Sequence, residues 1–182
     1  SKVRPAALAG LAYHADRRAL EIQVDEFLAQ GQELRARVKL ARPNSGEKEF
    51  LVGLVAPHID YQRGSLCYGA VYSSLREQKH DLFVLIGTAH QYSRNIFHLT
   101  PKDFDSPLGT LSCNVDLITK VANAYGLERS FADEFLHRRE HSLELQVPFL
   151  KRLNPLAQIA PILVGNFSNM LRSGRLPNEF DE

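Results

Sequence analysis

Apolar residues recur at helical spacing near the start of the chain. Asp16 fits an N-cap, and Gly31 fits the position just past a helix end. Residues 16–31 are therefore predicted to form an amphipathic helix, and the polar stretch 31–48 is predicted to form a loop. The apolar residues that share one face of this helix are Leu20, Val24, Phe27 and Leu28.

Two nearly continuous apolar runs predict buried strands, from Phe50 to Ala56 and from Asp81 to Ile86. Residues 66–77 lie between them and show helical spacing. Apolar strands separated by a helix are typical of a parallel βαβ unit that is covered on both faces. A third such run predicts a strand from Ala157 to Val164. The predicted fold class is α/β, with a mostly parallel or mixed sheet flanked by helices.

The remaining segments are less regular. Residues 95–100 fit a short strand, and 101–113 fit a loop or hairpin. A helix is predicted over 114–125, with its first residue as the cap. Another helix is predicted over 139–153, where Pro148 should kink it or split it into two.

Domain organisation and cellular setting follow from what the chain lacks. No repeat or low-complexity linker divides it, so the economical interpretation is one domain over 1–182, with 166–182 as an irregular tail. No apolar run reaches the roughly 20 residues that span a bilayer. The net charge of +1 gives no field that favours nucleic acid or an anionic membrane. Two cysteines make no disulfide framework, which favours a cytoplasmic setting.

Two histidines follow predicted strands. His58 comes directly after the first apolar run, and His90 comes shortly after the second. Ligands of open α/β sheets bind beyond the carboxyl ends of the strands, so both imidazoles are predicted to meet at one edge. Imidazole is a good ligand for zinc, copper or iron. The alternative is that both are loop histidines, one of them capping the following helix. Residues expected to line the same cleft are Asp60, Tyr61 and Ser65.

A second group of polar residues begins the predicted helix over 139–153. Glu140 and Glu144 lie four positions apart and share a helix face, and His141 lies beside them. His141 and Glu140 are the candidates for acid–base catalysis in the cleft. The alternative is a capped helix whose first-turn acids are solvated and favoured by the helix dipole.

At these residues the sequence resembles the Memo family, also known as the B protein of the AmmeMemoRadiSam system. The resemblance rests on short blocks whose order and spacing run through most of the chain. The blocks are Arg4-Pro5-Ala6, Gly10-Leu11-Ala12-Tyr13, Ala56-Pro57-His58-Ile59-Asp60-Tyr61, Gly87-Thr88-Ala89-His90, Asp105-Ser106-Pro107-Leu108-Gly109, Arg139-Glu140-His141-Ser142-Leu143-Glu144 through Leu150, and Pro161-Ile162-Leu163-Val164-Gly165.

The resemblance implies a fold like that of class III extradiol dioxygenases, which hold non-haem iron with two histidines and a carboxylate. Memo proteins look like relatives that keep the histidines and, in some members, replace the acid with a cysteine. Carried over, His58 and His90 are the metal ligands, with iron or copper expected and zinc as a further candidate. His141 is then a cleft residue that acts as acid or base or supports the ligands. The resemblance also implies a radical-SAM protein and an AMMECR-domain protein as gene-cluster partners, and an oligomer is compatible with it.

Memo-like chains normally continue beyond the Leu-Val-Gly block through further helices and strands that supply the third ligand. Here the chain is expected to be truncated or divergent after about residue 165. Removal of strands from a parallel sheet is expected to expose an edge and apolar surface.

Two functions remain open. One is a metal-dependent redox enzyme, and the other is a non-catalytic metal- or peptide-binding adaptor that uses the same cleft.

Overall fold

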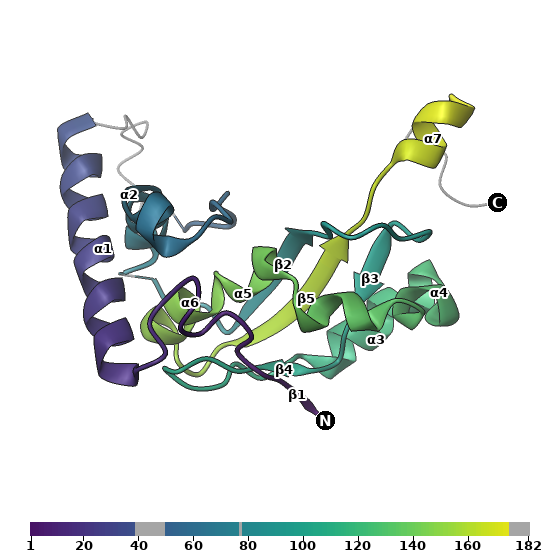
Figure 1. Cartoon of the computed structure of the whole chain (residues 1–182), viewed down its shortest axis with the longest axis horizontal. Helices are drawn as coiled ribbons and strands as arrows, with labels where there is room; N and C mark the ends of the chain where they lie inside the picture. Colours follow the sequence, from purple (N-terminus) through teal and green to yellow (C-terminus); the bar gives the residue numbers. More distant parts are fainter. Residues whose placement is uncertain (39–49, 77, 175–182) are drawn as a thin grey trace.

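The computed structural model describes residues 1–38, 50–76 and 78–174 (Figure 1). In these ranges the α-helices are α1 (Arg17–Val38), α2 (Tyr61–Tyr72), α3 (Val115–Tyr125), α4 (Leu127–Phe131), α5 (His141–Glu144), α6 (Val147–Leu153) and α7 (Ser168–Ser173). The 3-10 helices are η1 (Ser73–Leu75) and η2 (Glu134–Arg138). The strands are β1 (Val3–Arg4), β2 (Leu82–Thr88), β3 (Phe97–Leu99), β4 (Asp103–Phe104) and β5 (Gln158–Val164).

The main sheet has the order β2–β5–β3. β2 runs parallel to β5, with Leu82 opposite Gln158 and Thr88 opposite Val164. β3 pairs with β5 in the antiparallel direction. A separate parallel pair joins β1 to β4. The predicted mixed α/β class is therefore confirmed, and the strands predicted at 81–86, 95–100 and 157–164 are present as β2, β3 and β5.

The predicted strand over 50–56 is wrong, and with it the predicted βαβ unit. This segment is extended but joins no ladder within the described chain, and Val52 and Val55 are more than 90% exposed. Side chains bind its ends instead of a neighbouring strand. Gln78 Oε1 accepts from the Leu51 N–H at 2.8 Å, and Gln146 Nε2 donates to the Pro57 carbonyl at 3.0 Å. An apolar run thus specifies burial or extension, but a strand also needs a partner edge.

The first helix is confirmed but extends beyond its predicted end. Asp16 caps it by accepting the Ala19 N–H at 2.8 Å, and α1 then continues to Val38. Gly31 lies inside the helix instead of terminating it. There α1 crosses α2, and a Cβ on Gly31 would meet the Gly69 backbone at 1.8 Å. The glycine serves close helix–helix approach, a use that spacing along one helix cannot reveal.

The ends of the other helices differ less from their predicted positions. α2 begins at Tyr61, five residues before its predicted start, because Asp60 caps it by accepting the Arg63 N–H. Asn114 caps α3 as predicted. The helix predicted over 139–153 is split into α5 and α6, the latter with Pro148 in its first turn. The tail predicted to be irregular contains α7, while 39–48 and 175–182 lie outside the described residues.

Two hydrophobic clusters lie on opposite faces of the main sheet. The larger joins α1, α2, α5 and α6 to one face, through residues such as Leu143, Ile159 and Leu163. The smaller lies under α3 on the other face and includes Ile118 and Ala160. Each α3 and β5 side chain in that cluster is apolar, as expected for a helix packed on a sheet.

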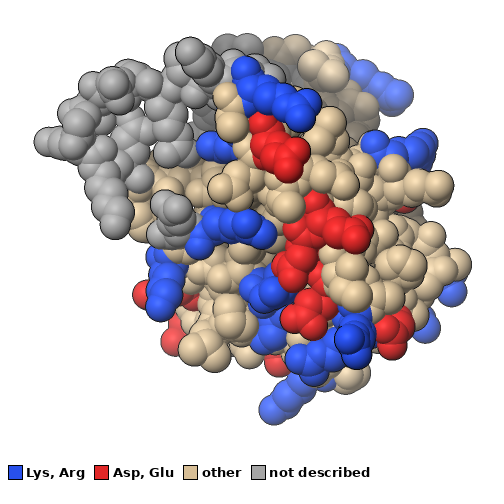
Figure 2. All heavy atoms as spheres, turned by 90° about the vertical axis from the view of Figure 1, so that its left-hand side faces the viewer, with Lys and Arg blue, Asp and Glu red and all other residues tan. Residues whose placement is uncertain are grey.

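Charges of both signs are interleaved on the face that α1 presents (Figure 2). Arg152 contributes to this mixture by pairing with Asp25 at 2.8 Å and lying 3.8 Å from Glu21. No single-sign surface for nucleic acid is seen on that face. Among the described residues, none of the helices combines the length and the apolar content needed to cross a bilayer.

Candidate metal centre

Three histidines meet near the ends of β2 and β5. The ring centroids of His58 and His90 lie 5.3 Å apart, and those of His90 and His141 lie 4.3 Å apart in a stacked arrangement. One ligand nitrogen from each ring lies within 4.8 Å of the other two. The predicted proximity of His58 and His90 is therefore confirmed. His141 joins them from the start of α5.

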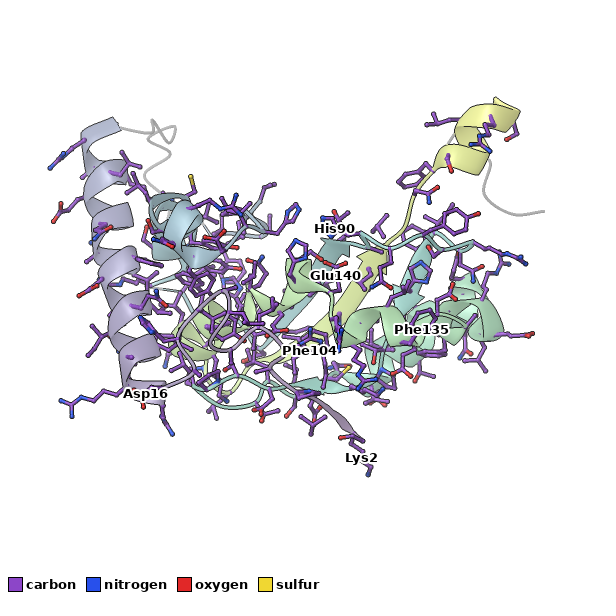
Figure 3. All side chains as sticks on the ribbon, viewed as in Figure 1. Lys2, Asp16, His90, Phe104, Phe135 and Glu140 are labelled. Carbon is purple, nitrogen blue, oxygen red and sulfur yellow. The ribbon has the colours of Figure 1, made fainter. Side chains whose placement is uncertain are left out.

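Glu140 lies beside His90 (Figure 3) and contacts two of the three histidines, His90 and His141. Its carboxylate accepts the His90 N–H at 2.9 Å and the Ser142 N–H at 3.0 Å. Its Oε1 also lies 2.9 Å from His90 Nδ1 and 3.2 Å from His141 Nδ1. Burial opposes ionisation, but these hydrogen bonds outweigh it and lower the pKa of Glu140. Glu140 is only 7% exposed, so it is these hydrogen bonds that favour an ionised carboxylate able to orient the imidazoles of His90 and His141.

The contact between His90 Nδ1 and Glu140 leaves Nε2 of His90 as the ligand atom. Metal-binding histidines commonly donate their other ring N–H to a carboxylate in this way. Burial lowers the pKa of His141, and the neighbouring His90 and His58 lower it further, while Glu140 raises it. His141 is therefore neutral at neutral pH, which is the form that binds a metal.

Side-chain hydrogen bonds connect the three segments that carry the histidines. Ser142 Oγ donates to the Thr88 carbonyl at 2.9 Å, which fixes α5 to the end of β2. Gln146 Nε2 donates to both the Ser142 carbonyl and the Pro57 carbonyl, beside His58. Gln146 Oε1 accepts from the Tyr72 hydroxyl at 2.8 Å, so the bridging amide is itself held in place. His58 is thus positioned by the hydrogen bond from Gln146 to Pro57, although the segment that precedes it is not part of the sheet.

A buried ion pair supports α5 from the other side, and no pattern along the chain indicates it. Arg4 is 2% exposed, and its Nη2 lies 2.6 Å from Glu144 Oε2. Arg4 also donates to the backbone carbonyls of His137 and Glu140. The Tyr13 hydroxyl completes the network by donating to Glu144 Oε1 at 2.6 Å. Residues from the first and last thirds of the chain meet here, so only three-dimensional structure reveals the pairing.

The residues predicted to line the cleft are dispersed. Asp60 caps α2 and pairs with the Arg63 guanidinium, which lowers its pKa. Tyr61 is fully buried in the aromatic core, where its hydroxyl donates to the Leu145 carbonyl at 2.6 Å. Ser65 is half-buried within α2. Tyr61 therefore belongs to the core and not to a cleft wall, because α2 begins at that residue and turns its ring inward.

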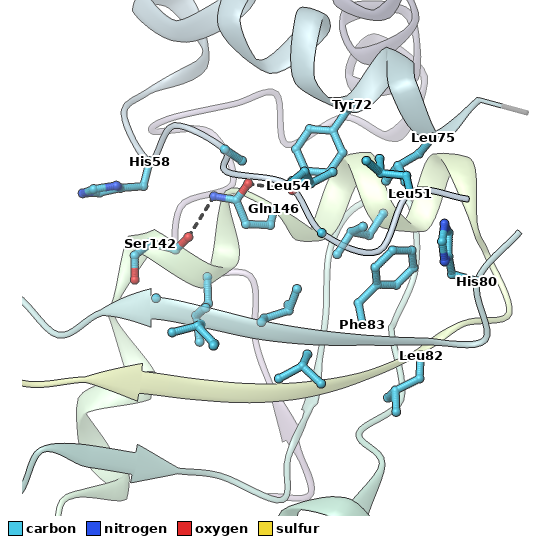
Figure 4. A pocket seen from close by; sticks show the side chains of 18 of the residues that line it. Leu51, Leu54, His58, Tyr72, Leu75, His80, Leu82, Phe83, Ser142 and Gln146 are labelled. Atoms are coloured by element: carbon cyan, nitrogen blue, oxygen red, sulfur yellow. Dashed lines mark hydrogen bonds between the residues drawn. The ribbon is translucent and has the colours of Figure 1, made fainter. Parts of the chain in front are cut away.

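A groove of about 370 Å³ opens beside the histidines, between the segment 51–56 and β2. His58 stands at one end and His80 at the other (Figure 4). Much of its lining is apolar, including Leu51, Phe83 and Leu75. The three-histidine group is thus open to solvent on one side and adjoins an apolar groove on another.

The donor set fits a transition-metal ion. Metal–nitrogen bonds are about 2.0–2.1 Å long, so two nitrogens on one ion lie at most about 4.2 Å apart. The nitrogens of the three histidines all lie within 4.8 Å of one another, close to that limit. The side chains of His90 and His141 are 42% and 38% exposed, so an ion can reach them from solvent.

Comparison with known proteins places these residues in a family context. The family model described as Memo-like protein matches residues 4–173. A MEMO1 family protein of Aquifex aeolicus is 32% identical over 133 residues, covering 73% of this chain and 35% of that protein. A MEMO1 family protein of Archaeoglobus fulgidus is 32% identical over 117 residues, covering 64% and 42%. One of Pyrobaculum arsenaticum is 30% identical over 166 residues, covering 90% and 56%. The chain therefore spans roughly a third to a little over half of these relatives.

Proposed function

The chain belongs to the Memo-like protein family, and from this premise we propose that it binds one transition-metal ion through His58, His90 and His141. The observation that carries the proposal is the convergence of three imidazoles, two of which, those of His90 and His141, contact the buried carboxylate of Glu140. Surface histidines rarely share such an orienting group, whereas metal ligands commonly do. The likeness to class III extradiol dioxygenases expected from the sequence is part of the same proposal.

Each residue has a defined role in this proposal. His58 and His90 are the ligands expected from the family resemblance, and His141 is the third ligand that this part of the chain offers. Glu140 fixes the ring of His90 and keeps its Nε2 directed at the ion. Three protein ligands would leave coordination positions open, where iron or copper would supply redox chemistry and zinc would supply Lewis-acid chemistry. The expected radical-SAM and AMMECR-domain partners remain predictions.

Metal content tests the proposal directly. The purified chain is incubated with Fe²⁺, Cu²⁺ or Zn²⁺, desalted and analysed by mass spectrometry of the elements. We expect about one ion per chain, and a loss of affinity of more than about tenfold in each of His58→Ala, His90→Ala and His141→Ala. His14→Ala is the matched control, because His14 is an exposed histidine outside the group. Equal metal content in all five proteins would refute the site.

The role of His141 is separated by the same experiment. If His141→Ala keeps its metal but loses the consumption of dioxygen that the wild type shows with catechol-type substrates, His141 acts as an acid or base and not as a ligand. A chain that binds metal but consumes no dioxygen with catechol-type substrates supports the alternative function, a non-catalytic binding protein. The exposure of His90 and the adjoining groove are the observations that favour this alternative.

A further inference from the structure

The groove beside the histidine group follows one edge of β2. β2 is an end strand of the main sheet, and within the described residues no strand pairs with its second edge. Every residue of β2, from Leu82 to Thr88, lines the groove. Successive residues of a strand point to opposite faces, so a groove over one face would be lined mainly by every second residue. This groove therefore runs along the edge of β2, where a strand presents unpaired N–H and C=O groups.

The opposite wall of the groove is the extended segment 51–56, which joins no ladder within the described residues. Leu51 and Leu54 line the groove (Figure 4), whereas the adjacent Val55 does not and is 91% exposed. A strand of seven residues is about 20 Å long, so a volume of about 370 Å³ beside β2 leaves a mean cross-section of about 20 Å². A helix with its side chains is about 10–12 Å across and does not fit. The shape suits one extended chain.

The two ends of the groove differ in charge. The end that carries His58 adjoins the proposed metal site. A divalent ion there adds two positive charges to the single negative charge of Glu140, so this end is positive when the ion is bound. His80 stands at the other end, and the walls between the two ends are largely apolar. A ligand that matches the groove is therefore extended and apolar, with a negative group at one end.

We propose that the groove binds the C-terminal segment of an apolar peptide as a strand parallel to β2, with its terminal carboxylate beside the metal ion. The proposal rests on the metal site proposed at His58, His90 and His141. β2 leads toward His90 at its C-terminal end, so the parallel orientation brings the carboxylate to the ion.

The unpaired edge of β2 favours a peptide over an aliphatic acid of the same length. An aliphatic chain would complement the apolar walls, but it would cover the N–H and C=O groups of the edge without binding them. Each polar group that is buried in this way costs free energy. A peptide backbone satisfies these groups by adding a strand to the sheet, and its alternate side chains contact the apolar walls.

Fluorescence anisotropy tests the proposal with a peptide of alternating valine and threonine that carries fluorescein at its amino end. The peptide is made as the free acid and as the C-terminal amide, and each is titrated with the metal-free and the Zn²⁺-loaded chain. We expect the Zn²⁺-loaded chain to bind the free acid more than about tenfold more tightly than the amide, because only the acid pairs with the ion. The metal-free chain should bind both peptides with affinities within about twofold of each other.

The zinc content of the same samples separates the two proposals. Equal affinities for acid and amide on a chain that holds zinc overturn the peptide proposal and leave the metal site standing. A chain that holds no zinc overturns both, because the terminal carboxylate then has no partner.

Backbone methylation tests the strand pairing itself. N-methyl groups on alternate residues remove the donors along one edge of the peptide, and two such peptides cover both edges. We expect at least one of them to bind the Zn²⁺-loaded chain more than about tenfold more weakly than the unmodified acid, because the edge facing β2 can no longer pair. If both bind as tightly as the unmodified acid, strand pairing is refuted. Displacement of the peptide by decanoate would then assign the groove to aliphatic acids.

Two neighbouring variants locate the binding site on the chain. Leu54→Glu places a charge in the groove, and Val55→Glu is the matched control because Val55 does not line the groove. We expect Leu54→Glu to weaken binding of the free acid by more than about tenfold and Val55→Glu to change it by less than about twofold. Both variants should keep the zinc content of the wild type. Equal effects of the two variants on peptide binding contradict binding in the groove.

Discussion

His137 is predicted to make the stability of the chain fall as the pH drops below about 6.5. Its side chain is 3% exposed, and Nε2 donates to the His98 carbonyl at 2.9 Å. Nδ1 is buried without a hydrogen-bond partner. Burial lowers the pKa of His137 from 6.5 to about 4, although the hydrogen bond to His98 acts in the opposite direction. A proton on Nδ1 would be a charged donor with nothing to accept it.

The sign and size follow from linkage. Between about pH 6.5 and pH 4 the unfolded chain carries a proton on this histidine and the folded chain does not, so folding becomes less favourable as the pH falls. The contribution is fully present above pH 6.5 and is lost toward pH 4. With 1.36 kcal/mol per pKa unit, the loss is about 2 kcal/mol between pH 8 and pH 5 and about 3 kcal/mol at pH 4.

The assay compares urea unfolding of the wild type and His137→Gln at pH 8 and pH 5. The glutamine amide can still donate to the His98 carbonyl but does not titrate. The wild type should lose about 2 kcal/mol more than the variant over this range, or about 4–8 °C in Tm. Carboxylates and other histidines titrate in both proteins and cancel in the comparison. Equal losses in the two proteins would refute the reasoning.

Two other predictions concern packing and metal affinity. Gly31→Ala should destabilise the chain by about 1–3 kcal/mol in urea unfolding, because the added Cβ would meet the Gly69 backbone at 1.8 Å. Gly53→Ala is the control and should not destabilise the chain, because no atom lies within 4 Å of the Cβ that it adds. Equal stability of the two variants would contradict the close crossing of α1 and α2. Glu140→Gln should weaken metal binding about 10–100-fold in a titration by removing the charge that orients His90, and unchanged affinity would exclude that role.

Much of the fold could be predicted because the local signals were strong. Caps at Asp16 and Asn114 marked the starts of α1 and α3, and β2 and β5 were visible as continuous apolar runs. Short elements such as β4 and α4 gave no comparable pattern, since they depend on contacts with distant segments. Gly31 was misassigned for the same reason. Its neighbour is Gly69 on another helix, so helical spacing gave no information about it.

The site shows the same division between local pattern and tertiary contact. His58 and His90 were expected to meet because two adjacent parallel strands would deliver them to one edge. They do meet, but the segment before His58 is unpaired and Gln146 holds it instead. The prediction about the pair was therefore correct although its structural reason was wrong. The family resemblance concerns residue positions and does not require the ladder, whereas the strand-end argument does.

The unpaired segment before His58 and the bare face of β2 lie on either side of the same strand edge. Parallel sheets bury both faces, yet Val52 and Val55 on one side and Val84 and Ile86 on the other are all more than half exposed. The apolar side chains of β2 therefore follow the pattern of a strand in a sheet covered on both faces, although the described residues leave one of its faces exposed.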